Sequence, residues 1–312
     1  CARCALWVVF SGRAYEDVSR AMSEKQVFDA VVVGGGPAGA QCILWLTKLG
    51  ISACMLEADK IGGLQARSPF TNSWLAVVQA TTSANQVAKN MKANILEQRC
   101  KVYHAECNRI DYLDEVGVFQ LSTSDKQYLA RNVVLATGTS ERVGVPEIPG
   151  AVLGLVGAHS MQCNNLRVAV LGGGDAACEV YHLALQKGAS RVKVFARSVR
   201  ARGSLWNSIP GSDKWVGQYS ESSDLVRFGV DSFSPDILCI CYGWDASIPE
   251  LGFDIRLDET GRIVADSSMQ TSFSGCYAIG DVNGNSYPCV ATAMSDGVFA
   301  AKSIERSLNE HL

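Results

Sequence analysis

The chain has 312 residues and a formal net charge of −3, with 47% hydrophobic and 19% charged residues. This length accommodates two domains, and the composition is that of a globular protein. The slight acidity argues against a surface for nucleic acid or anionic membrane, and no apolar run reaches the roughly 18 residues that a membrane span needs, so neither is expected as a partner.

The first part of the chain does not share the pattern of the rest. We interpret residues 1–27 as an extension outside the fold, and 1–21 as a translated upstream stretch, an expression artefact or a genuine N-terminal arm. Its apolar run at 6–10 is too short for a secretory signal, and no cleavage site follows it. We therefore expect a cytoplasmic protein whose 12 cysteines are mostly buried and reduced.

Strands alternate with helices from residue 28 onward, which indicates βαβ units and a parallel sheet. The first unit has an expected strand over 28–33, a helix over 37–49 and a strand over 51–56 that ends at Glu57. Further along, the pattern predicts a helix over 83–98 and strands over 102–104, 116–122 and 133–135.

The same unit begins again at Arg167, with a strand over 167–171, a helix over 175–187 and a strand over 191–195. The pattern breaks down after Arg202 and returns with strands over 236–242 and 275–279 and a helix over 289–308. Such internal duplication predicts an α/β fold with two Rossmann-like dinucleotide-binding domains.

A G-x-G-x-x-G motif formed by Gly34, Gly36 and Gly39 follows the first strand and opens the first helix. Gly34 permits the tight turn, Gly36 lets a pyrophosphate approach, and Gly39 lets the helix pack on the strand. The phosphate would sit at the helix N-terminus. Glu57 ends the second strand, where its carboxylate can accept hydrogen bonds from ribose hydroxyls. Together these features predict a bound dinucleotide.

Two more strands end in motifs that suit a flavin nucleotide. The strand over 133–135 leads into Ala136, Thr137 and Gly138, and the strand over 275–279 leads into Gly280 and Asp281. A Gly-Asp pair can place its carboxylate beside a ribityl hydroxyl and a flavin phosphate. The N-terminus of the following helix would face the flavin edge that becomes negative on reduction.

These motifs resemble the low-molecular-weight thioredoxin reductase family of FAD enzymes, and the resemblance covers about 28–308. It implies an FAD domain over 28–142 and 246–312, an inserted and shortened second nucleotide domain over 143–245, and a homodimer. The stretches that carry the resemblance are 34–39, 136–138, 172–174 and 278–281. Further FAD contacts implied by it are Pro37, Ala38, Gly63, Gln65, Asn72 and Val290.

The family's redox centre, a C-x-x-C before the second glycine-rich strand, has no counterpart here. Cys163 stands at the position of the second thiol, while Ser160 stands at that of the first, so an internal disulfide cannot form there. Cys163 and Cys289 remain candidate redox thiols, and Cys289 opens a helix, whose N-terminus lowers a thiol pKa. The pairs 239/241 and 1/4 are weaker candidates, against ordinary burial of the first pair.

The second nucleotide site also departs from the family. Its turn is kept, so a pyrophosphate can still bind, but the arginine cluster that grips the 2′-phosphate of NADPH is reduced. No acidic residue replaces the cluster, so the sequence does not support NAD. NADPH, a second flavin nucleotide and the loss of any ligand all remain open. The predicted contacts are Gly172, Gly174, Asp175, Ala176, Arg197 and Arg202.

The leading hypothesis is an FAD-dependent oxidoreductase with a non-standard electron route, similar to the diflavin-linked disulfide oxidoreductases of some oxygenic phototrophs. One alternative is an NADPH- or ferredoxin-dependent flavoprotein whose acceptor is not a disulfide. Another is a flavin-binding regulatory protein without catalysis. Redox partners would be ferredoxin or a thioredoxin-like protein. The four histidines show no metal-ligand spacing, so no metal site is expected.

Overall fold

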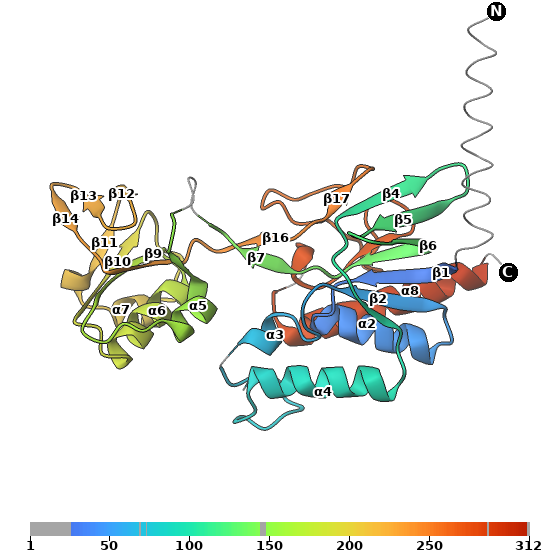
Figure 1. The fold of residues 1–312 in the computed structure, drawn as a ribbon, viewed down its shortest axis with the longest axis horizontal. Coiled ribbons are helices and arrows are strands. Elements are labelled where there is room, and N and C mark those ends of the chain that lie inside the picture. The colour runs from blue at the N-terminus through green and yellow to red at the C-terminus, as the bar shows by residue number, and fades with distance from the viewer. Residues whose placement is uncertain (1–25, 69, 73, 144–147, 286, 311–312) are drawn as a thin grey trace, which may run out of the picture. The chain divides into compact units, whose positions relative to one another are not determined.

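The computed structural model describes residues 26–68, 70–72, 74–143, 148–285 and 287–310. Residues 1–25, with the 1/4 cysteine pair, lie outside the described part. The chain divides into two compact units (Figure 1). One combines the residues up to Thr139 with those from Ala246 onward, and the other is Ser140–Asp245.

The first unit is built on an eight-stranded sheet in the order β17-β4-β5-β6-β1-β2-β3, with β18 paired to β6. The strands β18, β6, β1, β2 and β3 run parallel, whereas β5 pairs antiparallel with both β4 and β6. The bounds are β1 Val27–Val33, β2 Ala53–Glu57, β3 Val102–His104, β4 Arg109–Leu113, β5 Val118–Ser122, β6 Gln127–Leu135, β17 Glu250–Leu251 and β18 Cys276–Ala278.

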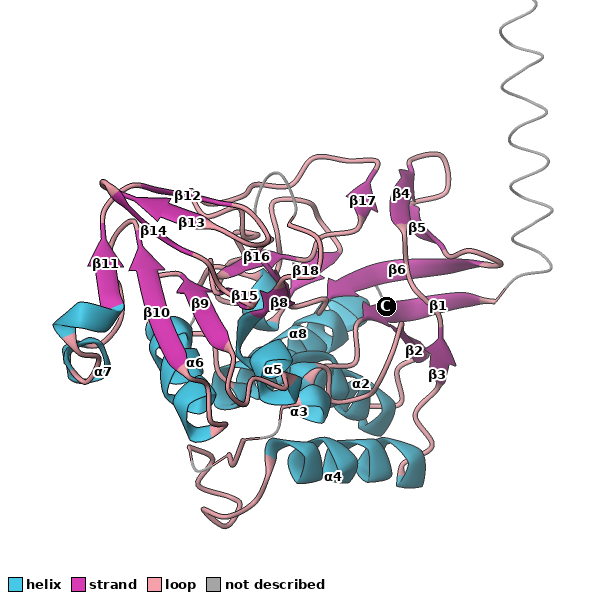
Figure 2. Ribbon diagram, turned by 60° about the vertical axis from the view of Figure 1, so that its left-hand side comes forward, coloured by secondary structure: helices cyan, strands magenta, loops and turns pink. Residues whose placement is uncertain are grey.

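Helices cover one face of this sheet (Figures 1 and 2). A Cβ added at Gly297 of α8 would come within 2.9 Å of the backbone nitrogen of Cys42 in α2, so these two helices lie in close contact. Ser83 caps α4, because its hydroxyl accepts a hydrogen bond from Gln86 N at 3.1 Å. The bounds are α2 Pro37–Lys48, α3 Leu64–Arg67, α4 Ala84–Glu97, η2 Gly280–Val282 and α8 Val290–Glu310.

Alternating side chains of the central strands divide the core of this unit into two layers. Val32 and Val134 are paired across β1 and β6 and pack with Ile43 of α2 on the helical side. Their neighbours Val31 and Val133 belong to a second buried cluster on the other side of the sheet. Burial on both faces explains why these strands read as continuous apolar runs in the sequence.

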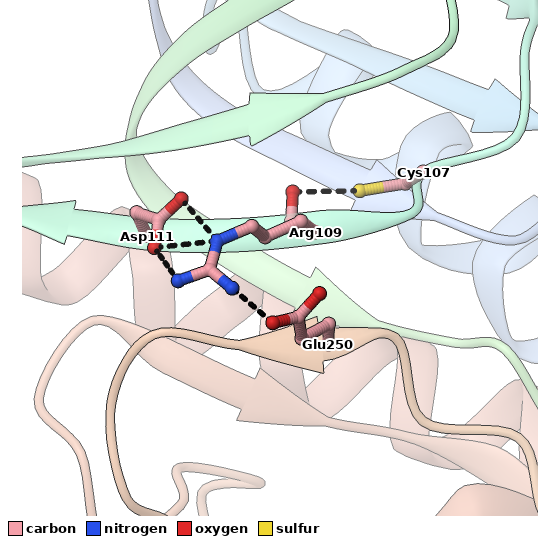
Figure 3. Close-up of polar contacts among 4 residues, drawn as sticks. All are labelled: Cys107, Arg109, Asp111 and Glu250. Atoms are coloured by element: carbon pink, nitrogen blue, oxygen red, sulfur yellow. Dashed lines mark hydrogen bonds and ion pairs between the residues drawn. The ribbon is translucent and has the colours of Figure 1, made fainter.

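A charged cluster joins β4 to the edge strand β17, which follows the return of the chain to the first unit (Figure 3). The Arg109 guanidinium donates to both carboxylate oxygens of Asp111 at 2.7–3.0 Å and also pairs with Glu250. The thiol of Cys107 donates to the Arg109 carbonyl oxygen at 3.7 Å. The ion pair with Arg109 and the pairing of β17 with β4 hold Glu250–Leu251 to the sheet, although β17 and β4 lie far apart in sequence.

The second unit has its own parallel sheet in the order β11-β10-β9-β15-β8 and a separate antiparallel sheet of β12, β13 and β14. The pair β7 Thr139–Glu141 and β16 Trp244–Ala246 forms where the chain passes between the units. The remaining bounds are β8 Val152–Leu153, α5 Gly154–Ser160, β9 Arg167–Leu171, α6 Asp175–Gln186, β10 Arg191–Ala196, α7 Gly203–Asn207, η1 Gly211–Asp213, β11 Lys214–Val216, β12 Tyr219–Glu221, β13 Val226–Phe228, β14 Asp231–Phe233 and β15 Ile237–Ile240.

The helix lengths bear on one expectation from the sequence. Among the helices of the described ranges, none combines the length and the apolar composition needed to cross a membrane. The longest of them, α8, has 21 residues but includes polar and charged side chains along its length.

Candidate functional site

A cavity of about 360 Å³ opens at the carboxyl ends of the parallel strands of the first unit. This is the edge at which open α/β sheets bind their ligands. All of the contacts predicted in this unit line the cavity except Gly39 and Asn72. The predicted residues that line it are Gly34, Gly36, Pro37, Ala38, Glu57, Gly63, Gln65, Ala136, Thr137, Gly138, Gly280, Asp281 and Val290.

The turn between β1 and α2 has the backbone geometry that only glycine suits. Gly34 has a φ of +103°, and a Cβ there would overlap the carbonyl oxygen of Ala136. A Cβ at Gly39 would overlap the Gly34 carbonyl oxygen, so the helix can pack this closely on the turn only without a side chain. Gly39 therefore shapes the cavity without lining it.

The N-terminus of α2 is open toward the cavity. Its N-cap, Gly36, supplies no side-chain hydrogen bond, and the first turn contains no acidic residue. A Cβ at Gly36 would meet no atom within 4 Å, so the space beside this backbone is free for a ligand. Unpaired N–H groups and the helix dipole make this a place for an anion such as a pyrophosphate.

Glu57 is fixed at the end of β2. Its carboxylate accepts hydrogen bonds from the backbone N–H groups of Gly35 and Asp59, the latter at 2.8 Å. Asp59 in turn pairs with Arg67 at 2.7 Å, and hydrogen bonding from this arginine lowers the pKa of Asp59. Asp59 and Arg67 both line the cavity, and sequence reasoning missed them because no motif marks a pair eight residues apart.

Two polar side chains that the sequence singled out behave differently. Asn72 is buried and donates to the side-chain oxygen of Gln65 at 2.7 Å, so it orients a residue that lines the cavity. The Thr137 hydroxyl is buried at the end of β6 without a hydrogen-bond partner among the described residues. A ligand with a polar group at this wall of the cavity would satisfy it.

The Gly280–Asp281 turn is held from the last helix. Asp296 of α8 is buried and accepts hydrogen bonds from Gly280 N at 3.0 Å and from the Asn283 side-chain amide at 3.1 Å. Burial raises the pKa of Asp281, with a smaller contribution from Asp296, while Arg262 opposes the shift. The turn thus presents a partly desolvated carboxylate to the cavity.

Cys289 precedes α8 and lines the same cavity. It is the exposed thiol among the ten cysteines that the structure describes. Partial desolvation raises its pKa, but hydrogen bonds from the Thr292 hydroxyl and from the N–H groups of Thr292 and Ala291 outweigh this, so the pKa is lowered. A lowered pKa increases the reactive thiolate fraction near neutral pH.

The other candidate thiols lie in the core of the second unit. Cys163 is 1% exposed and donates to the Ala184 carbonyl oxygen at 3.6 Å. Cys239 and Cys241 are also buried, and burial raises the pKa of Cys239 to about 12 and that of Cys241 further. Their surroundings are those of inert structural cysteines.

The predicted contacts of the second unit gather at its own glycine-rich turn. Gly172–Gly174 lies between β9 and α6, and the Gly173 carbonyl accepts hydrogen bonds from the N–H groups of 200 and 201. Asp175, followed by Ala176, opens α6, and the Asp175 carboxylate accepts from the backbone and side chain of Arg202 at 2.8 and 2.7 Å. This carboxylate therefore lies in the first turn of α6, where the helix dipole favours a negative charge.

Arg197, predicted to grip a phosphate, lies instead beside an acid that the sequence did not reveal. Its guanidinium is 3.5 Å from Glu221, which comes from β12. No acidic residue replaces the arginine cluster along the sequence, but the fold brings Glu221 to Arg197 from a strand further along the chain. A separation of 24 residues and an irregular intervening segment left no local signal for the pair.

The chain contains two glycine-rich strand–turn–helix units. One of them opens into a cavity lined by glycines, by an uncapped helix N-terminus and by a glutamate at the end of the second strand. This combination is typical of dinucleotide-binding α/β proteins. A family model described as pyridine nucleotide-disulphide oxidoreductase matches residues 28–205 and 215–297. The chain belongs to this family.

Individual relatives agree with this assignment. A thioredoxin reductase of Treponema pallidum is 28% identical over 88% of this chain and 95% of its own. A ferredoxin–NADP reductase of Lactococcus lactis is 24% identical over 91% and 95%. The crystal structure of T. acidophilum thioredoxin reductase superposes with a TM-score of 0.74 at 23% identity, covering 91% of this chain and all of the other. The chain is an FAD-dependent oxidoreductase of the thioredoxin reductase type, and the predicted fold class is confirmed.

Proposed function

We propose that the cavity of the first unit holds FAD and that this flavin exchanges electrons without an internal disulfide. Residues of the α2 N-terminus would hold the pyrophosphate, Glu57 the ribose hydroxyls, and Asp281 the ribityl chain. Bound FAD would supply a two-electron carrier. The observation that carries the proposal is the glycine-lined cavity of the first unit, combined with the burial of Cys163 in the core of the second unit.

The residues of this chain provide the surroundings of that carrier. The partly buried Asp281 and the buried Thr137 hydroxyl offer a polar wall to the cavity, and the N-terminus of α8 favours negative charge beside it. Cys289 stands on the same wall with a lowered pKa, so we assign it as the thiol through which a disulfide substrate would react. Its thiolate would attack the substrate disulfide and release one substrate thiolate, leaving a mixed disulfide.

For the second unit we propose a second flavin nucleotide in the place of NADPH. Support comes from the engagement of both predicted arginines with carboxylates of the same unit, Arg202 with Asp175 and Arg197 with Glu221. A 2′-phosphate would have to compete with these acids for each arginine. The turn at Gly172–Gly174 remains suited to a pyrophosphate, because a Cβ at Gly174 would meet no atom within 4 Å.

Flavin released on denaturation tests this assignment directly. Absorbance and mass analysis should give FAD, with about two flavins per chain if the second unit carries one. One flavin per chain would contradict the second-flavin proposal but leave the first site intact. Absence of flavin from protein refolded with excess FAD would contradict the proposed function as a whole.

A second candidate function is a flavoprotein with a non-disulfide acceptor, reduced by NADPH or by ferredoxin. The missing thiol pair favours it, as does the relative named a ferredoxin–NADP reductase. Anaerobic stopped-flow mixing separates the donors: bleaching of the flavin absorbance by NADPH within minutes supports NADPH, whereas bleaching by reduced ferredoxin alone supports ferredoxin. In either case we propose a cytoplasmic homodimer, with ferredoxin or a thioredoxin-like protein as its redox partner.

A further inference from the structure

Arg197 stands at a position that discriminates between adenine nucleotides. It directly follows β10, which pairs with β9, and β9 leads into the Gly172–Gly174 turn. In doubly wound dinucleotide sites this strand end faces the ribose 2′ position, where a carboxylate selects a free hydroxyl and an arginine accepts a phosphate. The surroundings of Arg197 therefore determine which nucleotides the second unit can accept.

Groups of the same unit already surround the Arg197 guanidinium. Its Nη2 lies 3.5 Å from Oε1 of Glu221, and its centre lies 5.3 Å from the ring of Tyr219 and 5.9 Å from that of Tyr242. The Tyr242 hydroxyl donates to the same Glu221 oxygen at 2.7 Å. Without any ligand, the Arg197 guanidinium therefore already has an ion-pair partner and two cation–π contacts.

Glu221 is held in this place. Its side chain is 15% exposed, against 56% for Arg197, and Glu221 pairs with Val226 between β12 and β13. The hydrogen bond from Tyr242, just beyond β15, fixes the carboxylate from a second segment. A 2′-phosphate arriving at Arg197 would meet this negative charge at close range, in surroundings that screen it less than bulk water does.

We propose that Glu221 makes the second unit select an adenine nucleotide whose ribose 2′ position carries a free hydroxyl. The ligand class is then FAD or NAD(H), both of which have that hydroxyl, and NADPH is rejected. This inference rests on the nucleotide site proposed above for the second unit and specifies what that site admits. The selecting property is the negative charge of Glu221 and not its size.

Two small probes that differ only in the 2′-phosphate test the inference on the FAD-loaded full-length protein. They are adenosine 5′-phosphate and adenosine 2′,5′-bisphosphate, measured by calorimetry or by displacement of flavin where the second unit carries one. The wild type should bind the monophosphate at least as tightly as the bisphosphate. Glu221→Gln keeps the size and an acceptor for Tyr242, and it should shift the ratio of the two dissociation constants at least about tenfold toward the bisphosphate.

Asp236→Asn is the matched control, because Asp236 is an exposed acid paired with Arg167 at the opposite end of β9, and it should leave the ratio unchanged. An unchanged ratio in Glu221→Gln, or a wild-type preference for the bisphosphate, would overturn the inference and leave the site standing. If neither probe binds any of the proteins, both the site and the inference fail. A second flavin per chain identifies FAD as the ligand, whereas saturable NADH binding to protein with one flavin identifies NAD(H).

Discussion

At the scale of single residues, substitutions at Gly36 and Gly39 should have different effects, one on ligand binding and the other on the stability of the fold. Both belong to one motif, but a Cβ at Gly39 would overlap the Gly34 carbonyl oxygen, whereas a Cβ at Gly36 would point into open space. Gly39→Ala should lower the free energy of unfolding by about 1–3 kcal/mol, the usual cost of overpacking. Thermal or urea unfolding of the FAD-free protein measures this, with wild type as reference.

Gly36→Ala should leave the stability of the FAD-free protein within about 0.5 kcal/mol of wild type, because nothing in the protein meets the new methyl group. It should nevertheless weaken FAD binding at least about tenfold, or about 1.4 kcal/mol, by blocking close approach of the pyrophosphate. Fluorescence titration with FAD measures the affinity. Undiminished affinity in this variant would show that the pyrophosphate does not lie against this turn.

Thr292 gives a single-residue test of the thiol beside the cavity. Its hydroxyl and N–H lower the pKa of Cys289, so the thiolate persists to lower pH than in an ordinary cysteine. Among residues 26–310, iodoacetamide should first modify Cys289, with a rate that rises with pH to a midpoint below the usual value of about 8.5. Peptide mapping of the FAD-free protein identifies the modified residue.

Thr292→Val should move that midpoint upward and slow alkylation at pH 7, because a stabilising hydroxyl donor is lost. Thr292→Ser keeps the hydroxyl and serves as the control. If both variants show the wild-type pH profile, the hydroxyl does not tune this thiol.

At the scale of elements, the strongest local patterns were the most predictive. The helix expected at 37–49 is α2, Pro37–Lys48, because a glycine turn and a proline mark its start and an apolar face runs along it. The strand expected at 102–104 is β3. By contrast, β4 was not predicted, because two of its five residues, Arg109 and Asp111, are charged and aspartate is uncommon in strands.

In the candidate site, too, residues in local motifs could be predicted, whereas contacts between distant segments could not. Gly34 and Gly36 of the glycine motif and the Gly280–Asp281 turn line one cavity. Glu221 and Tyr242 come to Arg197 from β12 and from the end of β15, and these short segments carry no period of their own. Contacts between distant short strands depend on the tertiary fold, so the sequence pattern could not reveal them.

Acid should lower the stability of the fold by protonating Asp236, whose ion pair with Arg167 holds the start of β9. Arg167 donates to Asp236 from its side chain and its backbone N–H, and these bonds hold the pKa of Asp236 at about 2. The unfolded value is about 4, so the bonds stabilise the fold above pH 4, and this contribution is lost as the pH falls toward 2. Asp236→Asn should therefore be less stable than wild type at pH 6 and equal to it near pH 2.

Thermal unfolding of both proteins at pH 6, 4 and 2.5 measures that convergence. Asp125→Asn is a suitable control, because Asp125 lies in the first unit in a surface turn, where it contacts Thr123 and Ser124. A difference between wild type and Asp236→Asn that does not shrink toward low pH would contradict the assigned protonation.

At the scale of the whole molecule, two copies of one unit have diverged in charge. In the first unit, the helix α2 has no acidic residue in its first helical turn. In the second unit, the helix α6 begins with Asp175, which is paired with Arg202. The first unit thus leaves its helix N-terminus open, as the proposed pyrophosphate site requires, and the second unit presents its own carboxylates to its arginines. This divergence fits a flavoprotein whose electron donor differs from NADPH.

The described thiols differ in exposure and not by unit, because both units contain buried cysteines. Of the ten described cysteines, nine are buried, and Cys289 is the exposed one beside the cavity. An oxidoreductase of this family that works through an internal thiol pair stores two electrons in its disulfide in addition to those on the flavin. The electron route that we propose would leave the flavin as the electron store.

Anaerobic titration of the flavin-loaded protein with dithionite tests this account most directly, with thiols counted by a disulfide reagent before and after reduction. We predict that reduction ends after about two electrons per bound flavin and exposes no new thiols. Uptake of about four electrons per flavin, accompanied by two new thiols, would contradict it, because the chain would then hold a redox-active disulfide that communicates with its flavin.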